Sequence, residues 1–259
     1  MTHRLFGDNK ALLVRTFILI LALVALSLGT GCASRKGVER NPDPFEPINR
    51  GIFKFNDAAD RFVLRPVAKG YQKITPDPVE RSISNAFDTW TYPVTIVNGF
   101  LQGKFKQGFS DIGRFCVNLT IGVLGLFDPA TSMGLEYHQE DFGQTFGRWG
   151  LPPGPYVVVP LFGPYTARSG IGTLLDVQIN PLVQWRNTSM RDKALILWAI
   201  DTRAALIGPD ELVREAFDPY LFVRDTYLQN REFLVNDGKS LDDFDDSSDG
   251  FDDGLGEDF

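Results

Sequence analysis

The sequence is poor in the residues that most often carry metal or nucleophilic chemistry, with two histidines and two cysteines in 259 residues. His3 and Cys32 lie near the amino terminus, which leaves His138 and Cys116 for the rest of the chain. A zinc site needs about three or four clustered ligands, and no second histidine or cysteine lies near His138 in the sequence. We therefore expect no metal site and no cofactor.

The motifs of common enzyme classes are also absent. The chain has no G-x-S-x-G nucleophile elbow, no G-x-G-x-x-G dinucleotide loop and no P-loop. Ser169, within Ala167–Gly170, lacks the preceding glycine of the elbow. The adjacent carboxylates Glu140 and Asp141 fit a surface or helix-capping role better than catalysis. The sequence therefore favours a protein that is not an enzyme.

An excess of basic charge is missing as well. The formal net charge is −7, and residues 32–236 contain 22 basic and 22 acidic residues. Nucleic-acid binding needs a net basic face, so we expect no nucleic-acid partner.

No apolar run reaches the length of about 20 residues that a spanning helix needs. The longest, Thr16–Leu28, has 13 residues, follows Arg4, Lys10 and Arg15, and precedes the small residues Gly29–Gly31. This layout is typical of a secretion signal. We predict a signal peptide over residues 1–31.

The cysteine that follows resembles the lipobox of bacterial lipoproteins, in which the thiol receives lipid and becomes the new amino terminus. Cleavage between Gly31 and Cys32 would leave a lipidated linker over residues 32–42. By analogy with other bacterial lipoproteins, Ala33 after the cysteine, rather than an aspartate, favours export to the outer membrane. The alternatives are ordinary signal cleavage near Cys32 and an uncleaved anchor.

Lipid on Cys32 would leave Cys116 as the only thiol. Its neighbours Phe115, Val117 and Leu119 are apolar, and we therefore predict a buried structural cysteine rather than a reactive one.

The carboxyl end, residues 237–259, has ten acidic residues against Lys239. Such a segment repels itself and buries little apolar surface, so we predict an acidic disordered tail. The clusters lack the spacing of a calcium-binding loop.

Residues 43–236 predict one mainly α domain of short amphipathic helices. Apolar residues recur at helical spacing in Glu46–Leu64, which should stop at Arg65-Pro66. Further helices are expected at Pro78–Trp90, Tyr92–Gln102, Lys104–Ile121, Ala167–Asp176, Met190–Ile207 and Pro209–Tyr227, the last with a continuation to Val235. In the segment Lys104–Ile121, one face is shared by Phe105, Phe109, Ile112, Cys116 and Leu119. Only Tyr156–Pro160 has the pattern of a short extended piece.

The stretch Ile121–Phe127 is apolar on every side and contains two glycines. It is too short to span a bilayer and poorly suited to an exposed loop. It should lie either in one leaflet of a membrane, which we favour, or deep in the core.

Several runs, in order, resemble the MlaA (VacJ) family of outer-membrane lipoproteins over about residues 43–236. The runs are Asp43–Arg50 with Phe53, Phe55 and Asn56; Arg65–Ala68; Val97–Gly103; Arg114–Gly122 with Phe127-Asp128; Asp141–Gly150; Gly154–Pro160; and Asp218–Tyr220.

The resemblance implies a ring-shaped helical protein in the inner leaflet of the outer membrane, with an amphipathic channel through its centre. Such proteins remove phospholipids from the outer leaflet, pass them to a periplasmic carrier and associate with trimeric porins. Head-group or channel contacts are expected from Asn49, Arg50, Phe53, Phe55, Asn56 and Arg61. Residues 53–57 match a family region thought to control channel opening.

Rim or membrane contacts are expected from Ile121, Val123, Leu124, Leu126, Phe127, Phe142 and Phe146. Two other functions stay open. One is a structural envelope lipoprotein that braces a porin, and the other is a phospholipase-like lipoprotein that uses His138.

Overall fold

The computed structural model describes residues 41–238. The predicted signal peptide, Cys32 and most of the linker and acidic tail lie outside these residues. Asp237, which we assigned to the tail, is part of the described fold. Its carboxylate pairs with Lys104 and lies 3.5 Å from Arg148. The tail prediction therefore applies only beyond Gly238.

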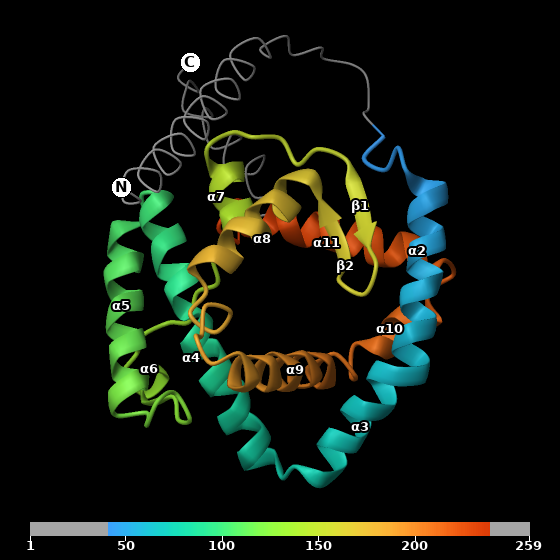
Figure 1. Cartoon of the computed structure of the whole chain (residues 1–259). Helices are drawn as coiled ribbons and strands as arrows, with labels where there is room; N and C mark the ends of the chain where they lie inside the picture. The colour runs from blue at the N-terminus through green and yellow to red at the C-terminus, as the bar shows by residue number, and fades with distance from the viewer. Residues whose placement is uncertain (1–40, 239–259) are drawn as a thin grey trace, which may run out of the picture. The chain divides into compact units, whose positions relative to one another are not determined.

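The described residues form a mainly helical fold, as predicted (Figure 1). The elements are α2 (Glu46–Ala59), the π-helical η1 (Asp60–Leu64), α3 (Arg65–Ile74), α4 (Asp77–Leu101), α5 (Phe105–Thr120), α6 (Pro129–Ser132), α7 (Phe142–Arg148), β1 (Tyr156–Val159), β2 (Gly163–Thr166), α8 (Ala167–Ile179), α9 (Thr188–Ala205), α10 (Asp210–Glu215) and α11 (Pro219–Val235). The strands β1 and β2 pair antiparallel, with Tyr156 opposite Thr166.

Two predicted breaks between helices are wrong. The first helix continues past Arg65-Pro66, because Pro66 lies in the first turn of α3 directly after the π turn, where the usual hydrogen-bond pattern is already changed. The two segments predicted on either side of Thr91 are one helix, α4, with Pro93 inside it. Proline in a helix interior costs about 3 kcal/mol, and packing of α4 against α5 and α9 offsets that cost.

A third difference lies near the carboxyl end, where a break was missed. The segment predicted as Pro209–Tyr227 is divided into α10 and α11 by an extended residue, Ala216. Asp218 then caps α11, accepting hydrogen bonds from the N–H groups of Tyr220 and Leu221, and Pro219 occupies the first turn.

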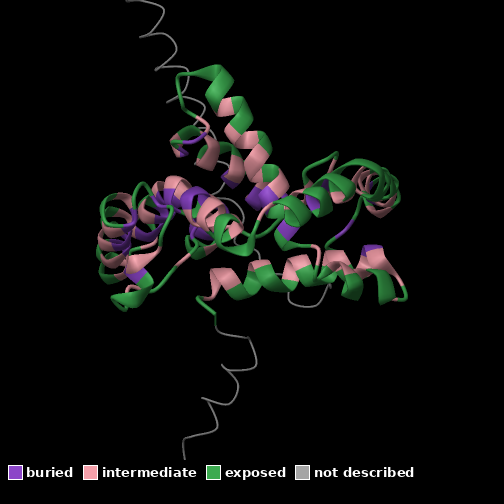
Figure 2. Ribbon diagram, turned by 90° about the horizontal axis from the view of Figure 1, so that it is seen from below, coloured by how far each residue is buried: buried purple, intermediate pink, exposed green. Residues whose placement is uncertain are grey.

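The apolar faces of the helices point outward. On α5, Phe105 and Phe109 are 61% and 67% exposed, whereas the buried positions are Gly108, Asp111, Arg114 and Asn118. Cys116 is exposed, so the prediction of a buried cysteine is wrong. The helical spacing correctly grouped the apolar residues of α5 on one face, but it did not indicate whether that face points inward or outward. Figure 2 shows exposed and buried residues alternating around the helices.

The buried residues are mostly polar. Among the described residues, 15 buried side chains are polar or charged and 11 are hydrophobic. Asp111, Asn98 and Thr145 are fully buried, although charged and amide side chains are seldom fully buried unless they are paired. The fold therefore combines a hydrogen-bonded interior with an apolar exterior.

Contacts between elements form a closed circuit within residues 42–238 (Figure 1). The order is α2, β1, β2, α8, α7, α4, α9, α3, η1 and back to α2. Across residues 41–238, no helix combines the length and the apolar character needed to cross a membrane.

Candidate functional site

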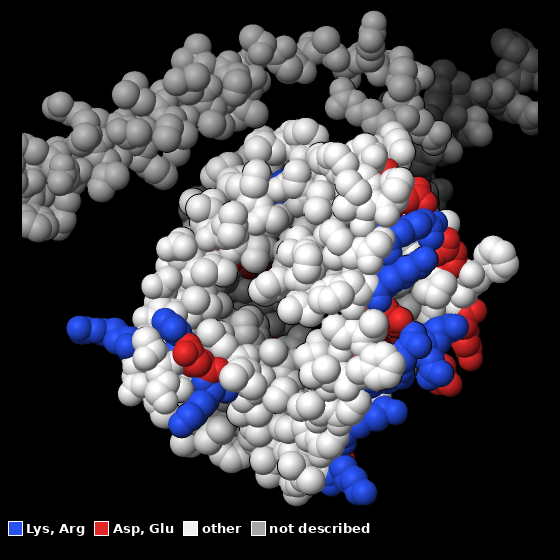
Figure 3. Space-filling view, turned by 45° about the vertical axis from the view of Figure 1, so that its right-hand side comes forward, with Lys and Arg blue, Asp and Glu red and all other residues white. Residues whose placement is uncertain are grey.

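An open pocket of about 260 Å³ lies between α2, η1, the β-hairpin, α9, α10 and α11. We call it the amphipathic pocket. One set of lining residues is charged or polar: Asn56, Asp57, Asp60, Arg203 and Asp210. The other set is largely apolar: Phe53, Tyr156, Val158, Gly163, Pro164, Leu206, Val213 and Val223. Figure 3 shows that one face of the molecule is hollowed near its middle.

Ion pairs organise the charged residues of this pocket. Arg203 binds both carboxylate oxygens of Asp60, at 2.5 and 2.8 Å, and Asp210 at 2.7 Å. The hydrogen bond that Arg203 donates to Asp60 is the largest influence on the guanidinium, and it raises the pKa of Arg203. Arg65 lies 3.2 Å from Asp210. This cluster joins η1 and α3 to the end of α9 and to α10.

Two asparagines from α2 hold the β-hairpin beside the pocket. Asn49 donates to the carbonyl of Tyr156 at 3.1 Å and to Asp43 at 2.7 Å, and it accepts from the N–H of Val158 at 2.9 Å. Asn56 donates to the carbonyl of Val159 at 3.0 Å and accepts from the N–H of Leu161 at 2.8 Å. The side-chain amides of both asparagines thus form hydrogen bonds with backbone groups of β1 and its turn, as a neighbouring strand would.

Asn49 is 1% exposed, so its prediction as a head-group contact is wrong. Its amide is used inside the fold, where a buried donor or acceptor needs a partner. Asn56 does line the pocket, as do Phe53 and Asp57. Its contact with lipid stays a prediction.

The two predicted arginines are already paired. Arg50 binds both oxygens of Asp218, at 3.2 and 2.9 Å, and Glu46 at 2.8 Å, with its guanidinium 4.5 Å from the ring centre of Tyr220. The hydrogen bond from Arg50 is the main cause of the lowered pKa of Asp218. Arg61 is exposed and lies 2.5 Å from Asp57. Neither arginine lines the amphipathic pocket.

Phe53 and Phe55 point to different surroundings. The ring of Phe53 packs edge-on against Tyr220 at 5.6 Å and lines the pocket. Phe55 is 55% exposed and belongs to the outward face of α2.

The segment Ile121–Phe127 lies at the surface, so the alternative of a deep core position is wrong. Its five large apolar side chains are exposed, whereas Gly122 and Gly125 are buried. Gly125 has a φ of +90°, and a Cβ there would lie 2.6 Å from the side chain of Thr89. The indole Nε1 of Trp90 donates to the carbonyl of Leu124 at 2.9 Å. Contact of this segment with a leaflet stays a prediction, as it does for Phe142 and Phe146, which are half-buried on α7.

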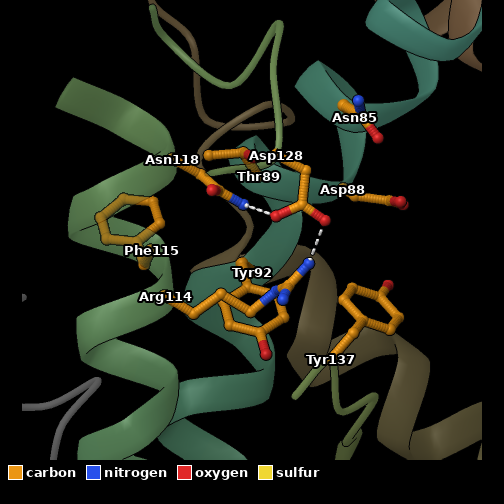
Figure 4. Close-up of a pocket in the computed structure, with 9 residues that line it drawn as sticks. All are labelled: Asn85, Asp88, Thr89, Tyr92, Arg114, Phe115, Asn118, Asp128 and Tyr137. Atoms are coloured by element: carbon orange, nitrogen blue, oxygen red, sulfur yellow. Dashed lines mark hydrogen bonds and ion pairs between the residues drawn. The ribbon is translucent and has the colours of Figure 1, made fainter. Parts of the chain in front are cut away.

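A separate polar cluster joins α4, α5 and the segment before α6 (Figure 4). Arg114 donates to Asp128 at 2.5 Å, and Asn118 donates to the same carboxylate at 2.9 Å. Burial raises the pKa of Asp128, but hydrogen bonds from Thr131 and Asn118 outweigh it, so the net shift is downward. The enclosed space, about 20 Å³, has room for one water molecule. We interpret this cluster as a structural joint.

His138 is part of the same region. Its Nδ1 lies 2.8 Å from Asp111 Oδ1, which also accepts from the hydroxyl of Tyr92 at 2.8 Å. Ser169, the hydroxyl considered above, is buried in the capping box of α8 and bonded to Tyr227 at 2.7 Å. These hydrogen bonds indicate a structural role for Ser169. Among the described residues, no group of histidine, cysteine and carboxylate ligands is placed to hold a metal ion.

The sequence analysis missed the carboxyl-terminal half of the amphipathic pocket. Asp201 lies two positions before Arg203 and Glu211 follows Asp210, so neither residue stands out as an isolated charge in the sequence. Asp60, a partner of Arg203, is 143 positions away from it, so no local pattern reveals the pair.

Comparisons with known proteins agree on one family. The chain matches the family model described as MlaA lipoprotein over residues 41–234. It is 35% identical to the intermembrane phospholipid transport system lipoprotein MlaA of Shigella flexneri, over 85% of this chain and 90% of that protein. It is 34% identical to the protein of the same name from Haemophilus influenzae, over 87% and 93% respectively.

One solved structure is similar, with a TM-score of 0.67 and 34% identity, and the match covers 75% of this chain and 99% of that one. It is described as the structural basis for maintenance of bacterial outer membrane lipid asymmetry.

Proposed function

Because the chain belongs to the MlaA lipoprotein family, we propose that it is an outer-membrane lipoprotein that removes mislocalised phospholipids from the outer leaflet. It thereby maintains the lipid asymmetry of the outer membrane. The names of its relatives as phospholipid transport lipoproteins support this function, as does the similar solved structure.

The observation that carries the proposal is the amphipathic pocket inside a closed circuit of elements with apolar outer faces. A phospholipid that leaves a leaflet must keep its head group solvated while its acyl chains stay in apolar surroundings. The charged residues around Arg203 suit the head group, and Phe53, Val158 and Val213 suit the chains. We propose that this pocket is part of a channel through a ring-shaped protein. No covalent step is needed.

The outward apolar faces support a position within one leaflet. Phe62 of η1, Phe109 of α5 and Phe162 of the hairpin turn are each more than half exposed, as are Ile121, Val123, Leu124 and Phe127. Exposed apolar side chains of this size favour contact with a membrane or a partner. We place the protein in the inner leaflet, anchored through lipid on Cys32. It would pass its cargo to a periplasmic carrier and associate with a trimeric porin.

The test is the labelling of surface phosphatidylethanolamine with a membrane-impermeant amine reagent. A strain that lacks the protein should show more label, which the wild-type chain restores and Cys32→Ala does not. Val213→Trp, which fills the amphipathic pocket, should restore the strain only in part. Val79→Trp, at a position 48% exposed on α4, is the matched control and should restore it fully.

Each outcome bears on a separate statement. Unchanged label in the deletion strain would contradict transport and leave the porin-bracing function. Full restoration by Val213→Trp, at equal protein levels, would contradict the pocket as the path. Release of fatty acid from liposomes by the pure protein, lost in His138→Ala, would support the phospholipase-like alternative instead.

A further inference from the structure

Two apolar pockets lie side by side between α4, α5, α9 and the segment that precedes α9. The first, of about 330 Å³, is lined by Trp90, Phe115, Leu119, Pro181, Leu182 and Trp185. The second, of about 300 Å³, has ten lining residues, among them Phe87, Trp90, Leu126, Trp185, Lys193 and Ala194. None of these residues lines the amphipathic pocket.

Two indoles stand between the pockets. Trp90 and Trp185 line both, and their rings meet edge to face with centres 6.0 Å apart. Because Trp90 Nε1 is bonded to Leu124, that nitrogen is not free to bind water in either pocket. Phe87, which lines the second pocket, packs edge-on against Trp90 with ring centres 5.9 Å apart and extends the aromatic wall.

The walls offer water few partners. Lys193 is the one charged residue among the lining residues of the two pockets. A buried water typically needs two to four polar partners, and apolar cavities bind apolar ligands instead. Spaces of this size with such walls suit hydrocarbon.

One basic residue, Lys193, lines the second pocket. Arg186, Arg191 and Asp192 lie near it in the sequence. Arg191 is paired with Asp192 at 2.9 Å, whereas Lys193 has no ion pair within residues 41–238. An ammonium group beside hydrocarbon-sized spaces complements a phosphate that carries acyl chains.

We propose that the two pockets are a second phospholipid site, with one acyl chain in each pocket, the indole pair between the chains, and the phosphate at Lys193. The proposal rests on the proposed function, because that function supplies the ligand class, a phospholipid. Leu126 connects the site to the exposed apolar segment Ile121–Phe127, so a lipid can enter without crossing a polar surface. A diacyl lipid fits two adjoining pockets better than a single-chain ligand does.

The test uses the mature lipidated protein in detergent, with one equivalent of a phospholipid that carries a photoreactive diazirine in an acyl chain. Irradiation should place adducts on peptides of α4 around Trp90 and of α9 around Ala194. Ala194→Trp fills the second pocket and should lower adducts there about fivefold or more, because the indole occupies the space that an acyl chain would fill. Ile196→Trp, on the exposed side of α9, is the matched control and should leave them unchanged.

The phosphate contact is tested separately. Lys193→Glu should lower adduct formation with the phospholipid probe but not with a diacylglycerol probe. Equal loss with both probes would contradict the phosphate contact. Adducts spread evenly over the exposed faces of α2, α5 and α9, or equal yields in Ala194→Trp and Ile196→Trp, would overturn the site.

A failure here is distinguishable from a failure of the proposed function. If the adducts are absent while the deletion strain still gains surface label, only the second site is lost. If the adducts are present while the label is unchanged, the protein binds phospholipid without clearing the outer leaflet. Circular dichroism of each variant shows whether its helices are intact.

Discussion

The guanidinium of Arg203 holds both carboxylate oxygens of Asp60, which lies in the π-helical turn between α2 and α3. This pair connects the carboxyl end of α9 to the first helical segment, and α3 packs along α9 on the same side. The circuit of elements is therefore joined at this point by charge as well as by packing.

Loss of that pair should destabilise the fold. In Asp60→Ala, Arg203 keeps only Asp210, and its guanidinium is largely buried. Breaking a buried pair costs about 3–5 kcal/mol; because Asp60 is 27% exposed, we expect a loss of about 2 kcal/mol in the free energy of unfolding. Thermal unfolding followed by circular dichroism measures it. Arg61→Ala, which breaks an exposed pair, is the control and should cost less than about 1 kcal/mol.

Asn49→Ala should destabilise the fold through the hairpin. The change removes hydrogen bonds with the N–H of Val158 and the carbonyl of Tyr156, both buried. An unsatisfied buried backbone group costs about 1–3 kcal/mol, so a loss of about 2 kcal/mol or more is expected in chemical unfolding. Ser82→Ala, which removes an exposed bond on α4, is the control. Equal stability of the two variants would contradict this role of Asn49.

The carboxyl of Asp176 should give the stability a distinct pH dependence. Burial raises its pKa to about 6 in the folded chain, against about 3.9 in the unfolded chain. Between these values the folded chain binds more protons, so this group's contribution to stability is greatest below about pH 4 and is lost as the pH rises through about 6.

In Asp176→Asn that contribution no longer depends on pH. The free energy of unfolding of the variant, relative to that of the wild type, should therefore rise by about 1–2 kcal/mol between pH 4.5 and pH 7.5. Urea unfolding at the two pH values measures the difference. The carboxylate of Asp141 is bound by Arg231 at 2.6 Å and has a lowered pKa, so its effect on the pH dependence is opposite. Taking the difference in the free energy of unfolding between the two proteins removes that effect. A constant difference between the two proteins would show that Asp176 does not titrate in this range.

Cys116 should report the surroundings of the outer face of α5. Its exposed thiol lies on the same face as Phe109 and Ile112. In vesicles, a charged maleimide should react about tenfold more slowly than an apolar one, because moving a charge into apolar surroundings is costly. The difference should disappear in detergent. A cysteine introduced at exposed Glu211 should react equally with both reagents if α10 faces water.

Helical spacing was sufficient to place most helices, but not to orient them. The pattern of Phe105, Phe109 and Ile112 defines an apolar stripe on α5. Whether such a stripe faces a core or the outside depends on the surrounding solvent, which the spacing does not contain. For the same reason Cys116 was assigned to the interior. The break predicted at Thr91 is wrong for a different reason, since the packing of α4 stabilises one continuous helix in spite of Pro93.

The site was predictable only in part. Phe53 and Asn56 were identified through the family resemblance, and both line the amphipathic pocket. Arg203 and the indole pair of Trp90 and Trp185 depend on contacts between segments far apart in the sequence. Strand β2, with Gly163 and Pro164 in its four residues, lacks the alternation by which a strand is recognised.

The inverted distribution of polar and apolar side chains sets unequal limits on how this sequence can vary. An interior position such as Asn98, which donates to Val94 and Asp176 and accepts from Thr145, tolerates few replacements because each partner sits at a fixed angle and distance. An outward position such as Phe109, whose ring contact is with Phe100 at 5.3 Å, should accept other large apolar residues more readily. Sequence divergence among relatives should therefore be high at the outward apolar positions and low at the interior polar positions. This is the reverse of the pattern in most domains that fold in water.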